Sequence, residues 1–168
     1  MTTLEPAAPM PGATPDPAPD SRPLLPKRAI LTFVLAYAGA FLILIVPVAL
    51  TLALRVQEVA PDSKESTLGI ISACGAAVAL LANPFFGALS DRTTARWGMR
   101  RPWIVGGALV GAAGLMIVAL APTPLMIGIA WVVVQASMNA VLAGLAAFLP
   151  DQVPPQQRGK VSALAGIA

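Results

Sequence analysis

The stretch best equipped for chemistry runs from Gly87 to Trp103 and reads GALSDRTTARWGMRRPW. It places four arginines around a single acid, Asp91, between two long runs without charge. A carboxylate beside guanidinium groups forms charge-assisted hydrogen bonds, which hold parts of a chain together without making or breaking covalent bonds. The chemistry that this stretch predicts is therefore ion pairing.

Charges in this stretch stand at unfavourable helix ends. Asp91 falls where the preceding helix closes, beside the negative end of the helix dipole, whereas Arg100 and Arg101 precede a helix whose dipole favours anions. Cytoplasmic loops of membrane proteins are rich in arginine, which accounts for the basic residues but not for Asp91. Asp91 therefore needs a partner, either an arginine of its own loop or the N-terminus of another helix.

The residue types used in most catalysis are scarce. The sequence has no His, and its one Cys, Cys74, lies inside an apolar run, where we interpret it as a small packing residue. This composition excludes a disulfide within the chain and an ordinary Cys/His zinc site. A membrane-embedded enzyme is disfavoured because no nucleophile–base pair is evident. We predict no catalytic residue, no metal and no cofactor.

The composition is that of a membrane protein. Hydrophobic residues make up 57% of the 168, and charged residues only 11%, about half the usual fraction in a soluble domain. The net charge of +3 does not indicate nucleic acid as a partner, because the basic residues cluster in loops. The lipid bilayer is the first partner that the sequence predicts.

Uncharged runs predict four complete transmembrane helices and the start of a fifth. At 1.5 Å per residue, a run such as 29–54 spans about 39 Å as a helix, enough to cross a hydrocarbon layer of about 30 Å. Prolines 122 and 124 divide the longest run into two helices. The predicted helices cover about 29–54, 66–90, 103–121 and 124–149, with an incomplete fifth at 157–168.

The distribution of basic residues predicts which side of the membrane each loop occupies. Residues 1–28 hold eight of the 17 prolines, and we predict that they form a disordered cytoplasmic tail. With the tail inside, nine of the 11 Lys and Arg residues fall on the cytoplasmic side. This bias predicts a multi-pass protein of the cell membrane whose N-terminus is cytoplasmic.

Two amides lie on one stripe of the fourth predicted helix. Gln135 and Asn139 are four residues apart, about 100° around the helix from a stripe of small residues at Ala136, Ala140 and Gly144. Amides within a membrane need partners. Two interpretations stay open: a hydrogen bond to another helix, or the lining of a wet cavity.

The basic stretch resembles the loop between the second and third helices of the major facilitator superfamily, a group of secondary transporters. The family pattern is Gly, three residues, Asp-Arg, one residue, Gly, and then basic residues. The residues that match it in order, which we call the latch loop, are Gly87, Asp91, Arg92, Gly98, Arg100 and Arg101. The spacing departs from the common form because Gly98 follows Asp91 by seven residues. The longer form, SDRTxxRxGxRRPW, is similar to the sugar/cation symporter branch, the glycoside–pentoside–hexuronide or sucrose type.

The resemblance implies an all-α integral membrane fold. Residues 29–168 are expected to form part of the N-terminal six-helix half of a twelve-helix transporter, with the C-terminal part of the same transporter as a missing partner. It also implies that charged residues after the fourth helix interact with the latch loop. The implied pairs are Asp91 with Arg158, or Asp151 with an arginine of residues 92–101.

The resemblance further implies a central cavity lined by the first and fourth helices. This makes Tyr37, Gln135 and Asn139 the best polar candidates for contact with a solute. The expected function is secondary active transport of a small solute, a sugar, by alternating access, with or without a coupling cation. The alternatives are a drug or metabolite efflux carrier of the same superfamily, and a small membrane scaffold protein that does not transport.

Overall fold

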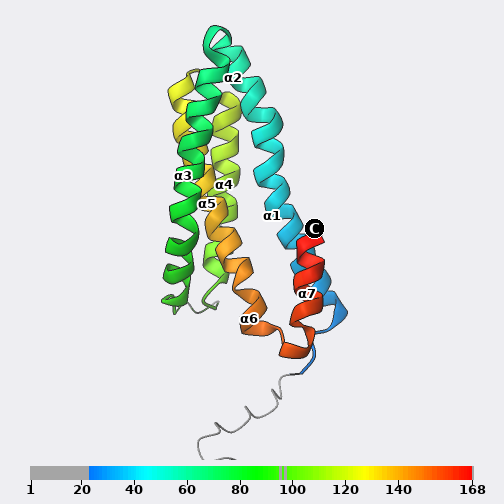
Figure 1. Cartoon of the computed structure of the whole chain (residues 1–168). Helices are drawn as coiled ribbons and strands as arrows, with labels where there is room; N and C mark the ends of the chain where they lie inside the picture. Colours follow the sequence, from blue (N-terminus) through cyan, green and yellow to red (C-terminus); the bar gives the residue numbers. More distant parts are fainter. Residues whose placement is uncertain (1–22, 95, 97, 168) are drawn as a thin grey trace, which may run out of the picture.

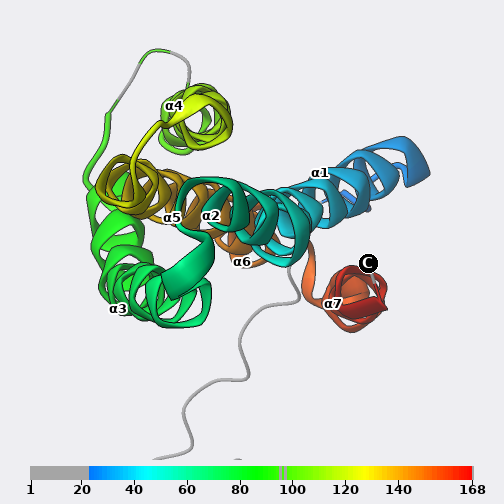
Figure 2. The ribbon, with the colours of Figure 1, turned by 90° about the horizontal axis from the view of Figure 1, so that it is seen from above.

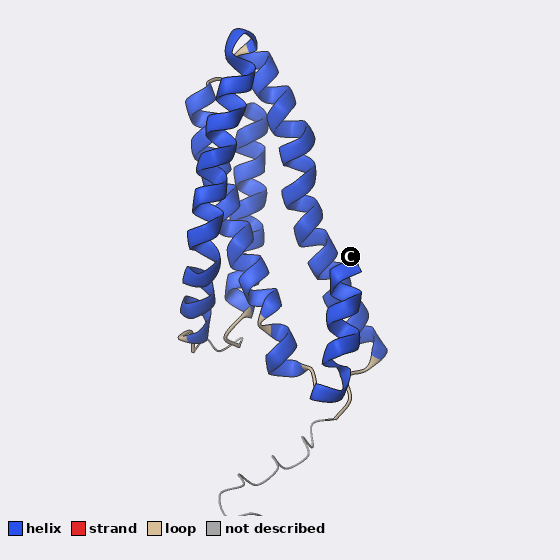
Figure 3. Ribbon diagram, viewed as in Figure 1, coloured by secondary structure: helices blue, strands red, loops and turns tan. Residues whose placement is uncertain are grey.

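The computed structural model describes residues 23–94, 96 and 98–167. Among these residues every regular element is helical and no strand occurs (Figure 3). Most of the predicted disordered tail at 1–28 lies outside the described residues. Its last two residues, Lys27 and Arg28, already belong to the first helix, so the tail was predicted slightly too long.

In the described part of the chain, four stretches are long and apolar enough to cross a membrane, as the sequence predicts. They are Lys27–Val59, Pro61–Asp91, Arg101–Leu120 and Pro124–Gln152. In chain order the helices labelled in Figure 1 are α1 (Lys27–Val46), α2 (Ala53–Val59), α3 (Lys64–Asp91), α4 (Arg101–Leu120), α5 (Pro124–Ala146), α6 (Phe148–Gln152) and α7 (Pro155–Ile167).

The first helix runs further than the predicted 29–54. A π-helical segment, Pro47–Leu52, joins α1 to α2, and the helical path ends only at Val59. Proline has no backbone N–H to donate, and a local widening of the helix is one way to accommodate it. The prediction stopped too early because it read Arg55 as the start of a polar loop. In the structure Arg55 pairs with Glu58 one turn later, at 2.5 Å, so both charges remain on the helix.

The other predicted helix boundaries differ from the structure by one to three residues. Pro84 lies inside α3 without ending it, and α3 extends from residue 64 to 91 rather than 66 to 90. The fourth predicted helix, 124–149, ends at Ala146 and is followed by the separate short helix α6. Helix α7 begins at Pro155, two residues before the predicted start, because proline is well suited to the first turn of a helix.

Helix α5 is the centre of the bundle, with α3 and α4 on either side of it (Figure 2). Half of its most apolar stretch is buried, against 11% for that of the first span, so α5 carries most of the core. Glycines permit this packing. A Cβ added at Gly107 of α4 would lie 2.6 Å from the carbonyl oxygen of Ser137, and one at Gly75 of α3 would lie 2.5 Å from Nε1 of Trp131.

Helices α1 and α7 lie side by side at the end of the bundle that holds α6 (Figures 1 and 2). The Gln157 side chain binds both backbone groups of Leu25, which precedes α1. The N–H of Leu25 donates to Oε1 at 2.8 Å, and Nε2 donates to the Leu25 carbonyl at 3.4 Å. This pair of hydrogen bonds joins positions 132 residues apart.

Candidate functional site

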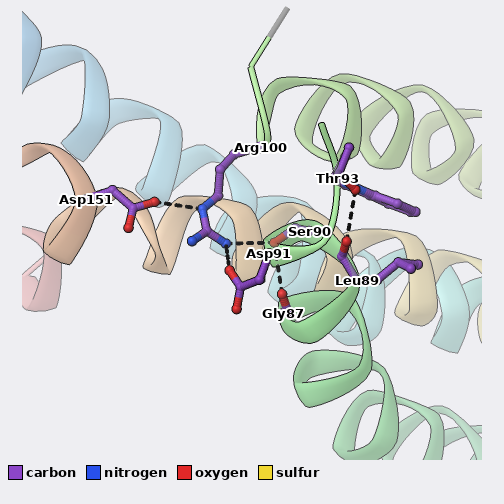
Figure 4. Close-up of polar contacts among 8 residues, drawn as sticks. Gly87, Leu89, Ser90, Asp91, Thr93, Arg100 and Asp151 are labelled. Carbon is purple, nitrogen blue, oxygen red and sulfur yellow. Dashed lines mark hydrogen bonds and ion pairs between the residues drawn. The ribbon is translucent and has the colours of Figure 1, made fainter. Parts of the chain in front are cut away.

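Three charged side chains from different elements meet at the end of the bundle where α3 closes (Figure 4). Asp91 is the last residue of α3, Arg100 is the N-cap residue of α4, and Asp151 lies in α6. We call Asp91, Arg100 and Asp151 the charge cluster. It joins both ends of the latch loop to the segment that follows α5.

Arg100 stands between the two acids. Its Nη1 lies 2.8 Å from Oδ1 of Asp91, and its Nε donates to Oδ2 of Asp151 at 2.9 Å. Nη1 also donates to the hydroxyl of Ser90 at 2.7 Å. The planar fork of the guanidinium group makes such multiple contacts possible, because its donors point in fixed and different directions.

The charge cluster explains how two charges can stand at helix ends whose dipole disfavours them. Asp91 at the end of α3 and Arg100 at the start of α4 each oppose the local helix dipole. In the structure these two charges pair with each other. The partner of Asp91 is therefore an arginine of its own loop, one of the two alternatives that the sequence left open.

Exposure differs across the cluster. The Arg100 side chain is 18% exposed, whereas those of Asp91 and Asp151 are 61% and 36% exposed. Burial acts to lower the pKa of Arg100, but the hydrogen bonds and charges of Asp151 and Asp91 outweigh it and raise that pKa above the ordinary arginine value. Because the guanidinium group is charged at any physiological pH, the cluster has a permanent cation at its centre.

Ser90 takes part in the cluster, although the sequence did not single it out. It is 1% exposed, and its hydroxyl donates to the carbonyl oxygen of Gly87 at 3.0 Å while accepting from Arg100. Gly87 thus contributes a backbone oxygen, and a Cβ added there would meet nothing within 4 Å. One signal in the sequence could have identified Ser90: it stands directly before Asp91, so its hydroxyl can bind the same arginine, Arg100.

A second pair of contacts holds the two ends of the latch loop together. Nε1 of Trp103 in α4 donates to Oγ1 of Thr93 at 2.9 Å, and Thr93 Oγ1 donates to the carbonyl of Leu89 at 2.9 Å. Gly98 has a φ of +100°, a conformation that only glycine adopts without strain. A glycine at this position lets the chain turn back so that Arg100 can reach Asp91.

The remaining arginines of the loop take no part in the cluster. Arg92, Arg96 and Arg101 are exposed, and none forms an ion pair within the described part of the chain. The sequence pattern could not distinguish them from Arg100, because all four arginines lie in one short loop.

Of the two alternative pairs that the resemblance implies, the structure has Asp151 with an arginine of residues 92–101, namely Arg100. Arg158 does not pair with Asp91 among the described residues. Instead its Nε donates to the carbonyl of Val153 at 3.0 Å, and its Nη2 donates to the carbonyl of Pro150 at 3.0 Å. Pro150 lies in α6 and Val153 directly follows α6, so Arg158 binds the backbone of the same segment that carries Asp151.

Tyr37 lies on α1 in a row of aromatic rings. Its ring centroid is 5.8 Å from that of Phe33 and 5.2 Å from that of Phe41. Together with Phe33 it lines a pocket of about 250 Å³ that Leu149 and Ser162 also border. The structure thus places Tyr37 beside a small space between α1, α7 and the chain after α5.

The two amides of α5 lie elsewhere. Asn139 is 7% exposed, and its Nδ2 donates to the carbonyl of Gln135 at 2.8 Å, so its bond is within its own helix rather than to another. Oε1 of Gln135 is buried without a hydrogen-bond partner in the described structure. The Gln135 side chain faces Gly75 of α3. Neither amide borders the pocket beside Tyr37.

The geometry of the charge cluster suits an attachment between α3, α4 and α6 that can break and re-form. The charge cluster joins three elements through side chains, and two of its members are more than a third exposed, so water can replace its bonds. Among the described residues no group of three or more His, Cys, Asp or Glu side chains could hold a metal ion.

Comparison with known proteins gives one match. The family model described as Major Facilitator Superfamily matches residues 6–168. No curated protein and no solved structure matches the chain.

Proposed function

We propose that this chain, which belongs to the major facilitator superfamily, is the N-terminal part of a transporter that moves a small neutral solute, a sugar, by alternating access. The family makes the protein a secondary transporter in general. The described helices include four candidate membrane spans, followed by the shorter helix α7. In our proposal a further, C-terminal part of the same protein completes the solute path, as internal repeats do in such transporters.

The observation that carries the proposal is the contact of Arg100 with both Asp91 and Asp151. We propose that this charge cluster is a latch that holds the latch loop against the segment after α5 in one conformation and releases it in another. Ion pairs with exposed carboxylates contribute about 0–1 kcal/mol each. Contacts this weak can break and re-form during a transport cycle, whereas a deeply buried pair could not.

Two features support a sugar as the solute. The latch loop has the longer form that resembles sugar/cation symporters. In addition, the predicted cavity residue Tyr37 lies in a row of aromatic rings, and amphipathic rings such as tyrosine present an apolar face with a polar tip. The sequence runs 29–54, 66–90 and 102–150, which make up most of the four spans, contain no charged residue, which fits a neutral solute.

The experiment uses the full-length protein in membrane vesicles of both orientations, with uptake of radiolabelled neutral sugars as the readout. We expect Asp91→Asn to reduce the initial rate of transport while membrane expression stays near normal, because the substitution weakens the pair with Arg100. The matched control is Asp62→Asn, which removes an exposed carboxylate from the loop before α3.

The outcomes separate the candidates. Sugar uptake that falls in Asp91→Asn but not in Asp62→Asn supports both the function and the latch. If uptake is equal in the two variants, the charge cluster does not act as a latch. Transport only of apolar drugs, and only out of the cytoplasm, would favour the efflux alternative. A full-length protein that inserts stably and transports nothing in either orientation would favour the scaffold.

A further inference from the structure

An apolar groove runs along the surface of the bundle between α4 and α5. Two adjoining cavities of about 440 and 480 Å³ form it, and they share Val110 of α4 and Val133 of α5. We call this space the α4/α5 groove. One end is lined by Phe86, Pro102 and Trp103, and the other by Ile117 and Thr123.

The length of the α4/α5 groove matches that of a lipid chain. At a rise of 1.5 Å per residue, the stretch of α4 from residue 103 to residue 117 is about 21 Å long. One leaflet is half of a hydrocarbon core of about 30 Å. The groove is therefore long enough to hold one acyl chain along its whole extent.

The lining of the groove is suited only to an apolar occupant. None of the described residues that border it is charged. Its two hydroxyl groups are already bonded within α5, because Ser137 donates to the carbonyl of Val134 at 2.9 Å and Thr123 accepts from the N–H of Met126 at 3.3 Å. A polar ligand would lose its hydration here without gaining a partner, which is costly.

The end of the groove beside the latch loop has a different character. The rings of Phe86 in α3 and Trp103 in α4 lie there with centroids 5.6 Å apart. Nε1 of Trp103 donates to Oγ1 of Thr93 at 2.9 Å, which ties the indole to the start of the latch loop. Tryptophan is enriched where hydrocarbon meets the lipid headgroups, because its ring is apolar and its N–H is polar. This end of the groove therefore suits the level of the headgroups.

Arginines flank the same end of the groove. Arg92 directly precedes Thr93, and Arg101 directly precedes Pro102. These two and Arg96, which we call the loop arginines, are exposed and form no ion pair with any described residue. The apolar groove thus ends beside three positive charges.

The described part of the chain supplies no carboxylate to the loop arginines. At this end of the bundle its acids are Asp91 and Asp151, and Arg100 contacts both. The other described acids belong to α2, to the turn after it and to the first turn of α3, at the opposite end (Figure 1): Glu58, Asp62 and Glu65. A ligand that brings both an apolar chain and a negative group would match the groove and its end. An anionic phospholipid has this combination.

We propose that the α4/α5 groove and the loop arginines bind one anionic phospholipid, whose acyl chain lies along the groove and whose phosphate pairs with Arg92, Arg96 and Arg101. A helix of another copy or of another segment could cover an apolar groove, but it would not account for three unpaired arginines at one end. The inference is independent of the proposed function, because it concerns the binding of lipid and not the movement of a solute.

The test identifies the lipid in the groove by photo-crosslinking. Val110→p-benzoylphenylalanine places a benzophenone in the groove. The matched control is Leu109→p-benzoylphenylalanine, because Leu109 is the adjacent residue and is 68% exposed but does not border the groove. The full-length protein is irradiated in vesicles of equal parts phosphatidylcholine and phosphatidylglycerol with the same acyl chains, and mass spectrometry identifies the adducts.

A second pair of positions serves if the first does not fold. Gly106 borders the groove, and a Cβ added there would meet nothing within 4 Å. Val105 is its exposed neighbour and does not border the groove. The same substitution at these two positions repeats the comparison closer to the latch loop.

We expect phosphatidylglycerol adducts to exceed phosphatidylcholine adducts at position 110 by roughly fivefold or more, because each arginine near a lipid surface favours anionic lipid by about that factor. At position 109 the ratio should stay near that of the vesicles. Arg92→Gln and Arg101→Gln should each lower the ratio at position 110 by roughly threefold to fivefold. Arg28→Gln, which removes an exposed arginine from the start of α1, should leave it unchanged.

Three results would overturn the inference. The first is the same ratio of adducts at positions 109 and 110. The second is a ratio at position 110 that does not fall when all three loop arginines are replaced by glutamine. The third is a set of adducts at position 110 with protein instead of lipid, which would show that another helix fills the groove.

Discussion

At the scale of single residues, Arg100 is the cation on which the charge cluster depends. One guanidinium group contacts two carboxylates and a buried hydroxyl, and these three partners come from two different helices. Lysine cannot reproduce this arrangement, because its ammonium group is a point charge without the planar fork of donors. We therefore expect the stability of the charge cluster to depend on an arginine at position 100, and not only on a positive charge there.

We predict that Arg100→Lys lowers the free energy of unfolding by about 0.5 kcal/mol and Arg100→Gln by about 1 kcal/mol, in keeping with partly exposed ion pairs. Thermal unfolding of the detergent-solubilised full-length protein measures the difference. The matched control is Arg101→Gln, which removes an exposed arginine without an ion pair among the described residues. Equal stability of Arg100→Gln and Arg101→Gln would contradict this account of the cluster.

The sequence predicted these residues better than it predicted their pairing. Asp91 was identified as a charge in need of a partner because it opposes the helix dipole. The choice of Arg100 over three neighbouring arginines depends on where Gly98 turns the chain, a backbone angle that no charge pattern reveals. Of the two alternative pairs that the resemblance implied, the structure has Asp151 with Arg100 and not Asp91 with Arg158, whose side chain binds the backbone carbonyls of Pro150 and Val153 instead.

At the scale of helices, close packing on α5 depends on the glycines of α4. Gly107, Gly111 and Gly114 are all buried against α5, and added Cβ atoms would lie 2.6 to 2.9 Å from α5 atoms. The contact at Gly107 is with a backbone oxygen, which cannot rotate away as a side chain can. In lipid such contacts are a main source of helix association, because the hydrophobic effect gives little preference for another helix over lipid.

We predict that Gly107→Ala destabilises the bundle by about 1–3 kcal/mol, the usual cost of forcing extra atoms into a packed interface. Gly106→Ala is the control at the adjacent position, where a Cβ would meet nothing within 4 Å. Helix propensity favours alanine equally in both variants, so the difference between their thermal unfolding midpoints isolates the packing term. A Gly107→Ala protein as stable as Gly106→Ala would refute the close approach of α4 and α5.

Helices were largely predictable, whereas some of their contacts were not. Uncharged runs located the four spans because a membrane core excludes charge over a fixed thickness. Helix ends shifted by two to five residues where prolines or paired charges extended a helix, as at Arg55 and Pro155. The bonds between Leu25 and Gln157 had no signal, since they join positions 132 residues apart through an ordinary amide.

At the scale of the whole molecule, the proposed latch requires that the charge cluster lie on the cytoplasmic side of the membrane. The latch loop, α6 and the start of α7 lie at one end of the bundle, and the turn between α2 and α3 lies at the other (Figure 1). Of the ten basic residues that the structure describes, eight belong to the first end, and Arg55 and Lys64 belong to the other. A bias of this size predicts that this end faces the cytoplasm.

Accessibility of single cysteines tests this orientation most directly. In a Cys74→Ser background of the full-length protein, Thr94→Cys marks the latch loop and Ser63→Cys marks the opposite end of the bundle; both positions are exposed. A membrane-impermeant maleimide added to intact cells should label position 63 and not 94, and should label 94 once the membrane is opened. Labelling of position 94 in intact cells, with 63 protected, would contradict a cytoplasmic latch and the transport mechanism built on it.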